Sequence, residues 1–319
     1  MISKSEPAAA LAGAPLFADL PSNIVSSLAL ELRRIELAPG ELLWRQGETS
    51  GALHVVETGC LRVTASGPGE REVELARVGP GDVLGELPLL AGGEHAASVR
   101  AAEFASVLAL DRGRFRALLA SLDPSAEALR QRLLNIVCER LRRRHAHLCA
   151  MLGGGPAPRA AGDLVSEPAP APPHSYLARL ALFRDFRDRE LDELLAVSDV
   201  IDIGRGMEVC AEGATPAFCA VTLCGALEEL VRRRDGGVRV RLAGPGLATC
   251  YVGLLDGLPS SVSVSARERA RLVLVSRAAF DDLVAARTQA GRSFLEALQR
   301  DLVGALRVAQ HPLARLSFG

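Results

Sequence analysis

A short run of glycine, carboxylate, histidine and small side chains begins at Gly85. A glycine at the mouth of a helix lets backbone N–H groups approach an anion closely, and Pro88 suits a first helical turn because its missing N–H would be unpaired there. The Glu86 carboxylate can accept a hydrogen bond from a hydroxyl group. The types and spacing of these residues predict a site for a small anion that also carries a hydroxyl group. The residues expected to form the site are Gly85, Glu86, Leu87, His95, Ala96, Ala97 and Ser98.

In order and spacing, this run resembles the phosphate-binding cassette of cyclic nucleotide-binding domains. Three further segments resemble the strands and turns of the same family's β-roll, so the resemblance covers most of residues 15–120. It implies that Glu86 binds the ribose hydroxyl of cAMP or cGMP. It also implies that the backbone at Ala96 and Ala97 closes over the cyclic phosphate, with the Ser98 hydroxyl beside it. The three further segments are 40–48, 53–63 and 79–82.

One residue departs from the family's pattern. The family usually places an arginine just before the paired alanines, where it holds the cyclic phosphate, and here that residue is His95. An arginine offers two hydrogen bonds and a permanent charge, whereas a histidine offers a single contact and is only partly charged near neutral pH. We therefore expect this site to bind a cyclic nucleotide weakly.

The sequence pattern recurs in the second half of the chain. Phe17 and Phe183 lie 183 − 17 = 166 residues apart, and Phe115 and Phe280 lie 280 − 115 = 165 residues apart. This unit far exceeds the ~20–50 residue period of solenoid repeats, so the chain is predicted to hold a duplicated domain. Glycines follow the same offset: Gly40, Gly47 and Gly59 correspond to Gly206, Gly213 and Gly225.

The second copy of the cassette lacks the polar groups of the first. Cys250 and Tyr251 replace the glycine and the glutamate, and Ser260 replaces the histidine. We expect this degenerate site, which also includes Ser261, not to bind a cyclic nucleotide in the family's way. Tyr251 is expected where the ribose belongs, so its side chain would close the pocket.

The composition divides the chain into four parts. We expect a flexible N-terminal tail over 1–14, a cyclic nucleotide-binding-like domain over 15–150, a Pro/Ala/Gly linker over 151–174 and the degenerate second domain over 175–319. Both domains fall in the range of ~100–200 residues that is common for domains. The predicted fold class is mainly β with flanking helices (α+β), built as two tandem jelly-roll-like β-rolls of the cyclic nucleotide-binding type.

A long amphipathic helix is expected at 124–150, at the end of the first domain. Its arginines at 140 and 142–144 fit a solvated helix end, and a patch for nucleic acid or an acidic partner is the alternative. Its apolar stripe predicts an interface, because exposed apolar patches usually mark one and relatives of this family dimerise through the equivalent helix. A homodimer, or a contact with a regulated partner, is expected at Leu133, Ile136, Val137 and Leu141.

Composition excludes several classes of function. The net charge of −1 gives no overall attraction to DNA, and no apolar run reaches the ~18 residues of a membrane span. Seven cysteines without a Cys-x-x-Cys pair indicate reduced thiols in a cytoplasmic protein. Lys4 is the only lysine, which suggests a GC-rich bacterial genome. Motifs of nucleotide-hydrolysing, serine-hydrolase and zinc-protease sites are missing, so neither an enzyme nor a cofactor or metal is expected.

Three functions remain open from the sequence. The first is a regulatory protein, arranged like the regulatory subunit of cAMP-dependent protein kinase, that binds cAMP or cGMP in its first domain and controls an unknown protein partner. The second is a ligand-independent interaction scaffold built on two degenerate domains. The third, ranked last, is a transcription regulator, since the charge and the motifs give no reason to expect DNA as a partner.

Overall fold

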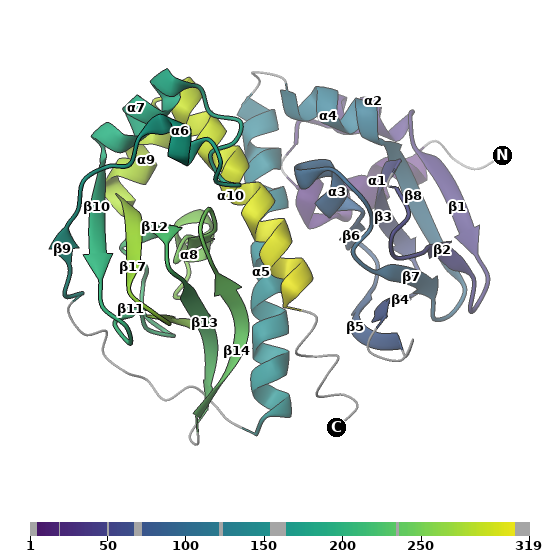
Figure 1. Ribbon diagram of the computed structural model, residues 1–319. Helices are drawn as coiled ribbons and strands as arrows, with labels where there is room; N and C mark the ends of the chain where they lie inside the picture. Colours follow the sequence, from purple (N-terminus) through teal and green to yellow (C-terminus); the bar gives the residue numbers. More distant parts are fainter. Residues whose placement is uncertain are drawn as a thin grey trace. The chain divides into compact units, whose positions relative to one another are not determined.

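The computed structural model describes residues 5–18, 20–49, 51–66, 72–120, 124–153, 164–233 and 236–309 (Figure 1). The chain divides into two compact units, one ending at Val137 and one beginning at Cys138. Helix α5 (Pro124–Met151) crosses this boundary. The division therefore falls inside a helix, whereas the sequence analysis extends the first domain to residue 150.

The first unit contains two four-stranded antiparallel sheets among its described residues. Their strand orders are β1-β8-β3-β6 and β2-β7-β4-β5. The strands are β1 (Arg33–Leu37), β2 (Leu42–Trp44), β3 (Ala52–Thr58), β4 (Leu61–Ser66), β5 (Glu72–Val78), β6 (Val83–Leu84), β7 (Ser98–Ala101) and β8 (Ala105–Asp111).

Neighbouring residues of β3 and β8 enter two different clusters of buried apolar side chains. Val55 and Leu108 belong to one cluster, whereas Val56 and Val107, one position away on each strand, belong to the other. This alternation follows from the two-residue period of a β-strand. The second cluster also contains Leu61 of β4, from the other sheet, so the two sheets pack face to face as a roll.

Helices cover the other face of the first sheet. Phe17, Val25, Phe115 and Leu129 come from four different helices and all join the cluster that contains Val55. The helices of this unit are α1 (Ser5–Gly13), η1 (Pro15–Phe17), α2 (Ser22–Ala29), α3 (Glu86–Ala91), α4 (Arg112–Ala120) and the first part of α5.

The N-terminal segment corrects one expectation. Helix α1 begins at Ser5, and its Leu11 is fully buried in the first unit's core. The alanine-rich sequence is a good helix former, and it gains stability by burying this leucine. The segment 5–13 is thus part of the folded domain and not a flexible tail, while residues 1–4 lie outside the described residues.

The second unit repeats the two-sheet architecture, as the duplicated sequence pattern predicts. Its sheets have the orders β15-β12-β17-β10-β9 and β11-β16-β13-β14. The strands are β9 (Glu167–Pro168), β10 (Ser198–Ile203), β11 (Glu208–Cys210), β12 (Phe218–Cys224), β13 (Leu227–Arg233), β14 (Gly236–Ala243), β15 (Ala248–Thr249), β16 (Ser263–Ala266) and β17 (Ala270–Ser276). The helices are α6 (His174–Leu177), α7 (Asp188–Ala196), α8 (Val252–Asp256), α9 (Arg277–Ala285) and α10 (Gln289–Val308).

A pair of equivalent glycines shows why the repeat is visible in the sequence. Gly59 and Gly225 have φ angles of 80° and 78°, in the left-handed region. A Cβ atom on either residue would lie 2.3 Å from a backbone oxygen, that of Phe104 or Arg269 respectively. Only glycine fits both the conformation and the space, so each roll requires glycine at this turn.

Two further expectations concern the segments around α5. Part of the expected linker, 151–174, joins a sheet, because Pro168 of β9 pairs with Ile201 of β10; residues 154–163 lie outside the described residues. Within the apolar stripe of α5, Leu133 is fully buried in the first unit's core and Leu141 is buried beside a small cavity of the second unit. Both residues of the stripe are therefore already buried within the chain. The homodimer through 124–150 stays a prediction, but an exposed apolar stripe at these two residues no longer supports it.

Candidate ligand-binding site

The first cassette starts at a left-handed glycine. Strand β6 ends at Leu84, Gly85 then adopts a φ of 82°, and α3 begins at Glu86. Glu86 and Leu87 are both buried, with Glu86 only 1% exposed. The turn thus places a carboxylate in the interior of the roll, where a polar group requires a partner.

The second half of the cassette is fixed by a stacked pair of rings. The imidazole of His95 lies flat against the Trp44 indole, with ring centroids 4.1 Å apart and an interplanar angle of 11°. Trp44 Nε1 donates a hydrogen bond of 3.0 Å to the carbonyl oxygen of Ala97. The His95 backbone N–H donates to the Glu48 carbonyl oxygen at 2.8 Å. His95, Ala97 and Trp44 are therefore held together as one packed group.

Burial keeps two histidines of this group neutral. His95 is 6% exposed, and burial lowers its pKa to about 4, although the Glu48 carboxylate acts in the opposite direction. The ring of His54 lies 5.0 Å from that of Trp44. Burial, followed by the charges of His95 and Arg33, lowers the pKa of His54 to about 4 as well. At neutral pH neither imidazole carries the positive charge that an arginine would supply.

The remaining residues of the predicted site occupy a strand and its approach. Ala96 is half-buried and Ala97 is buried, directly before β7. The Ser98 hydroxyl accepts a hydrogen bond of 2.9 Å from the Gln46 backbone N–H. Sequence reasoning missed Trp44 and His54 as part of this group. The available signal was that the chain's single tryptophan lies inside the segment 40–48 that resembles the family.

The second cassette keeps the backbone shape of the first. Cys250 adopts a left-handed φ of 63°, as Gly85 does at the equivalent position, and α8 begins two residues later. Tyr251 is 1% exposed, and its hydroxyl donates a 2.7 Å hydrogen bond to Asp301 Oδ2. Burial, together with the charge of Asp301, raises the pKa of this tyrosine well above its usual value.

A network of charged side chains surrounds Tyr251. The Arg241 guanidinium contacts Asp301 Oδ1 at 2.7 Å and Glu229 Oε1 at 3.4 Å, and it donates to the Ala248 carbonyl oxygen at 2.9 Å. Burial raises the pKa of Glu229, while the arginine opposes that rise. These groups satisfy one another, so the interior of the second roll is occupied by its own polar side chains.

The space left at the second cassette is small. A cavity of about 20 Å³ lies beside Cys250, Tyr251, Ser260 and Ser261, whereas ligand pockets usually measure roughly 300–1,000 Å³. The Ser260 hydroxyl donates to the Val262 carbonyl oxygen at 2.8 Å. The Ser261 hydroxyl shares a 2.9 Å hydrogen bond with Nδ1 of His145. All four residues of the expected degenerate site therefore lie around one small cavity.

One arginine of α5 binds this second cassette. Arg142 makes a two-point contact with Asp256 at the end of α8, with Nε–Oδ2 and Nη2–Oδ1 distances of 2.6 and 2.9 Å. The expectation of a solvated helix end is wrong for Arg142, because both side chains are largely buried. The expectation of a solvated side chain does fit Arg143, which is exposed and pairs with Glu139 four residues earlier on the same helix.

The chain matches known proteins over its first roll. The family model of the cyclic nucleotide-binding domain matches residues 34–121. The chain is 39% identical over 111 residues to the cyclic AMP receptor protein of Thermus thermophilus, which covers 34% of this chain and 51% of that protein. It is 32% identical over 152 residues to the HTH-type transcriptional regulator Cmr of Mycobacterium tuberculosis, covering 48% and 60%.

One solved structure is similar to the chain over most of its length. The regulatory domain of Toxoplasma gondii PKA with cAMP is 17% identical, covers 89% of this chain and 92% of its own, and gives a TM-score of 0.36. The chain spans only 51% to 62% of the length of the first curated relatives that it matches. Within the described parts of the chain, no helix combines the length and the hydropathy that a membrane crossing requires. Residues 34–121 are thus the part of the chain that matches the cyclic nucleotide-binding domain family.

Proposed function

We propose that the first roll binds a cyclic nucleotide, cAMP or cGMP, weakly, and that this binding controls a partner protein without catalysis. The observation that carries the proposal is the cassette itself. Its left-handed Gly85 and buried Glu86 are in place, but His95 is neutral and stacked on Trp44 where an arginine would be charged.

Each residue of the cassette has a role in this proposal. Glu86 accepts a hydrogen bond from the ribose hydroxyl, and the backbone around Gly85 and Leu87 faces the phosphate. Ala96, Ala97 and Ser98 form the opposite side, where small side chains leave the backbone accessible. His95 contributes at most one contact to the phosphate, so the charge-assisted pair of hydrogen bonds is lost.

Two lines of support come from the relatives. Several are cyclic AMP receptors or cAMP-activated regulators by name, and the identity to the cyclic AMP receptor protein reaches 39% over 111 residues. A cytoplasmic location and a bacterial origin fit this proposal, and both rest on the composition. The identity of the partner is left to experiment.

Calorimetric titration of the full chain with cAMP and cGMP tests the proposal. We expect a dissociation constant in the micromolar range or weaker. His95→Arg should tighten binding roughly ten- to a hundredfold, because a charge-assisted contact is worth about 1.5–3 kcal/mol. Glu86→Ala should weaken it. His147→Arg makes the same change at an exposed residue of α5 and should leave binding unaltered.

The same titration separates the alternatives. If Glu86→Ala removes all binding, the second roll binds no nucleotide, which is the result that its small cavity leads us to expect. If neither nucleotide binds the wild-type chain or His95→Arg, the proposal fails and the ligand-independent scaffold is preferred. That second candidate rests on the Tyr251–Asp301–Arg241 network, which fills the second roll with its own side chains. A gel-shift experiment with genomic DNA fragments tests the third candidate, a transcription regulator.

A further inference from the structure

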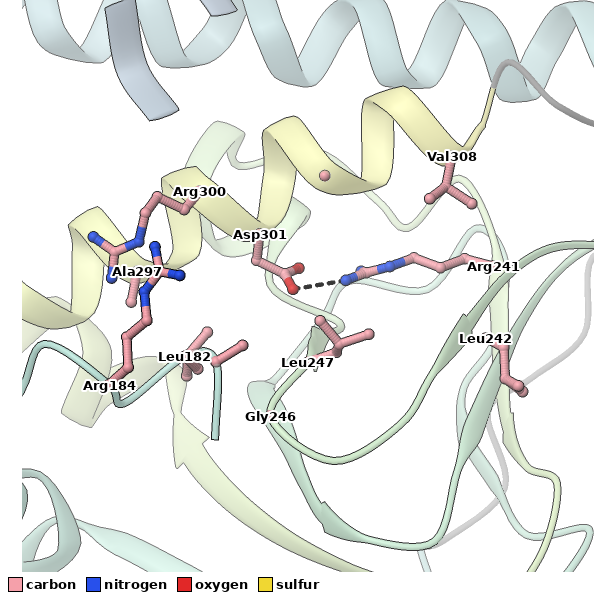
Figure 2. A pocket seen from close by; sticks show the side chains of 12 residues that line it. Leu182, Arg184, Arg241, Leu242, Gly246, Leu247, Ala297, Arg300, Asp301 and Val308 are labelled. Carbon is pink, nitrogen blue, oxygen red and sulfur yellow. Dashed lines mark hydrogen bonds and ion pairs between the residues drawn. The ribbon is translucent and has the colours of Figure 1, made fainter. Parts of the chain in front are cut away.

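A larger cavity of the second roll is lined by Arg241 and Asp301 of the network around Tyr251, but by none of the cassette residues. It measures about 290 Å³ and is lined by α10, by the end of β14 and by the segments around residues 182 and 246 (Figure 2). This volume lies at the lower end of the roughly 300–1,000 Å³ typical of small-molecule pockets. The lining reaches the surface, because Leu242 is 47% exposed and Val308 is 40% exposed.

The positive charge of this cavity is unevenly balanced. Figure 2 shows Arg184 and Arg300 side by side at one end of the lining. Both contact the same oxygen, Oδ2 of Asp185, at 3.5 Å from Arg184 Nε and 3.0 Å from Arg300 Nη2. Two guanidinium groups thus share one carboxylate, which leaves one positive charge in excess at this end.

One guanidinium nitrogen at this end is also short of a hydrogen bond. Nη2 of Arg300 is buried, and the angles of its contact with Asp185 do not make it a hydrogen bond; it has no other such partner among the described residues. A buried donor that lacks a hydrogen-bond acceptor destabilises the protein. An anion beside it would satisfy the donor and neutralise the excess charge at once.

The third arginine of the lining lies between two carboxylates, so it offers no unbalanced positive charge to a ligand. Arg241 contacts Asp301 at 2.7 Å and Glu229 at 3.4 Å, and Figure 2 shows the Arg241–Asp301 pair across the middle of the lining. The rest of the wall is apolar: Leu182, Leu242, Leu247, Ala297 and Val308. The cavity therefore combines one cationic end with an apolar body.

We propose that this cavity is a binding site for a small monocarboxylate with an apolar body. Arg184 and Arg300 bind the carboxylate, since a guanidinium presents a planar pair of donors that matches two carboxylate oxygens. The apolar wall takes the hydrocarbon part, which gains free energy by leaving water. The site uses none of the cassette residues and adds a second, chemically different ligand to the protein.

Calorimetry on the full chain with octanoate as the probe tests this site. Octanol has the same hydrocarbon chain without the charge, and inorganic phosphate has charge without an apolar body. We expect octanoate to bind more tightly than either. The double variant Arg184→Gln/Arg300→Gln should weaken octanoate at least about tenfold, the size of one charge-assisted contact, and leave octanol unchanged. Arg205→Gln, at an exposed residue of the same unit, is the matched control.

A second variant blocks the cavity without removing charge. Gly304 lines the cavity from α10, and a Cβ atom built on it meets nothing within 4 Å. Gly304→Leu should therefore fill the cavity and abolish binding of both octanoate and octanol. It should not lower the melting temperature, because leucine is a better helix former than glycine.

Three results would overturn the proposal. Octanoate that does not bind, or binds no better than octanol, removes the anion site. Affinity for octanoate that is unchanged in the double arginine variant removes the role of Arg184 and Arg300. Binding that survives in a folded Gly304→Leu protein places the ligand elsewhere, and Gly304→Val repeats this test if the leucine variant does not fold.

Discussion

Asp301 is the residue on which the interior of the second roll most depends. Its side chain is 3% exposed. One oxygen contacts Arg241 at 2.7 Å, and the other accepts a 2.7 Å hydrogen bond from the Tyr251 hydroxyl. Asp301→Ala would leave a buried guanidinium and a buried hydroxyl without their main partner.

The expected cost of Asp301→Ala follows from those contacts. Breaking a buried ion pair costs about 3–5 kcal/mol. Glu229 and the Ala248 carbonyl remain beside Arg241, so the lower end of that range applies. The unpaired Tyr251 hydroxyl adds about 1 kcal/mol, which brings the total to about 4 kcal/mol. For a unit of this size, each kcal/mol lowers the melting temperature by roughly 2–4 °C.

Differential scanning calorimetry of the full chain measures this effect as a fall in the transition of the second unit. Tyr251→Phe removes only one hydrogen bond and should cost about 1 kcal/mol. Asp281→Ala, at an exposed residue of α9, should stay within about 0.5 kcal/mol of the wild-type protein. A loss below about 1 kcal/mol in Asp301→Ala would refute the view that this network fills and stabilises the roll.

Three further outcomes are expected. Burial lowers the pKa values of His54 and His95 to about 4 and of His145 to about 3. The unfolded chain then binds more protons below pH ~6.5, so urea titrations should show stability falling as pH drops from 6.5 toward 4, by up to about 1.4 kcal/mol per pH unit for each histidine. A nucleotide phosphate beside His95 would raise its pKa above about 4, so the affinity for cAMP should strengthen as the pH falls from about 6 toward 4.5; a flat profile over that range would exclude a phosphate contact from a charged His95. Arg142→Ala should lower the free energy of unfolding of the second unit by about 3 kcal/mol, because it leaves the buried Asp256 carboxylate without its partner. Arg143→Ala should change that free energy by less than about 0.5 kcal/mol.

The predicted homodimer has a direct test as well. Light scattering at micromolar concentration should give twice the chain mass of 33.7 kDa if the 124–150 helix mediates association. A mass near 33.7 kDa would remove the homodimer and leave only a contact with another protein.

The features that could be predicted from the sequence are those with a local signature. Gly59 and Gly225 are fixed by the space at a turn, and the β3 alternation is fixed by strand geometry, so the rolls and their duplication are readable along the chain. The cassette residues could be predicted through their resemblance to the family's motif, and their binding of a nucleotide stays a prediction.

What could not be predicted depends on contacts between distant residues. Leu11 lies in an alanine-rich segment that resembles a tail until its burial is known. Arg142 and Asp256 are 114 residues apart, and no local sequence pattern around either residue predicts their contact. The stacking of His95 on Trp44 likewise requires two segments that only the folded roll brings together.

The left-handed backbone at Cys250 has a consequence for how such cassettes arise. A residue with a Cβ atom pays about 1–2 kcal/mol to hold this conformation, yet the turn is kept, and Tyr251, Leu254 and Leu255 around it are buried. The surrounding packing is therefore sufficient to impose the cassette's shape on a sequence that has lost its polar groups. A cassette held in this way is pre-organised. Binding of a ligand to such a cassette would not be opposed by the conformational entropy of ordering the loop. The shape of the cassette at Cys250 therefore needs no bound ligand to maintain it.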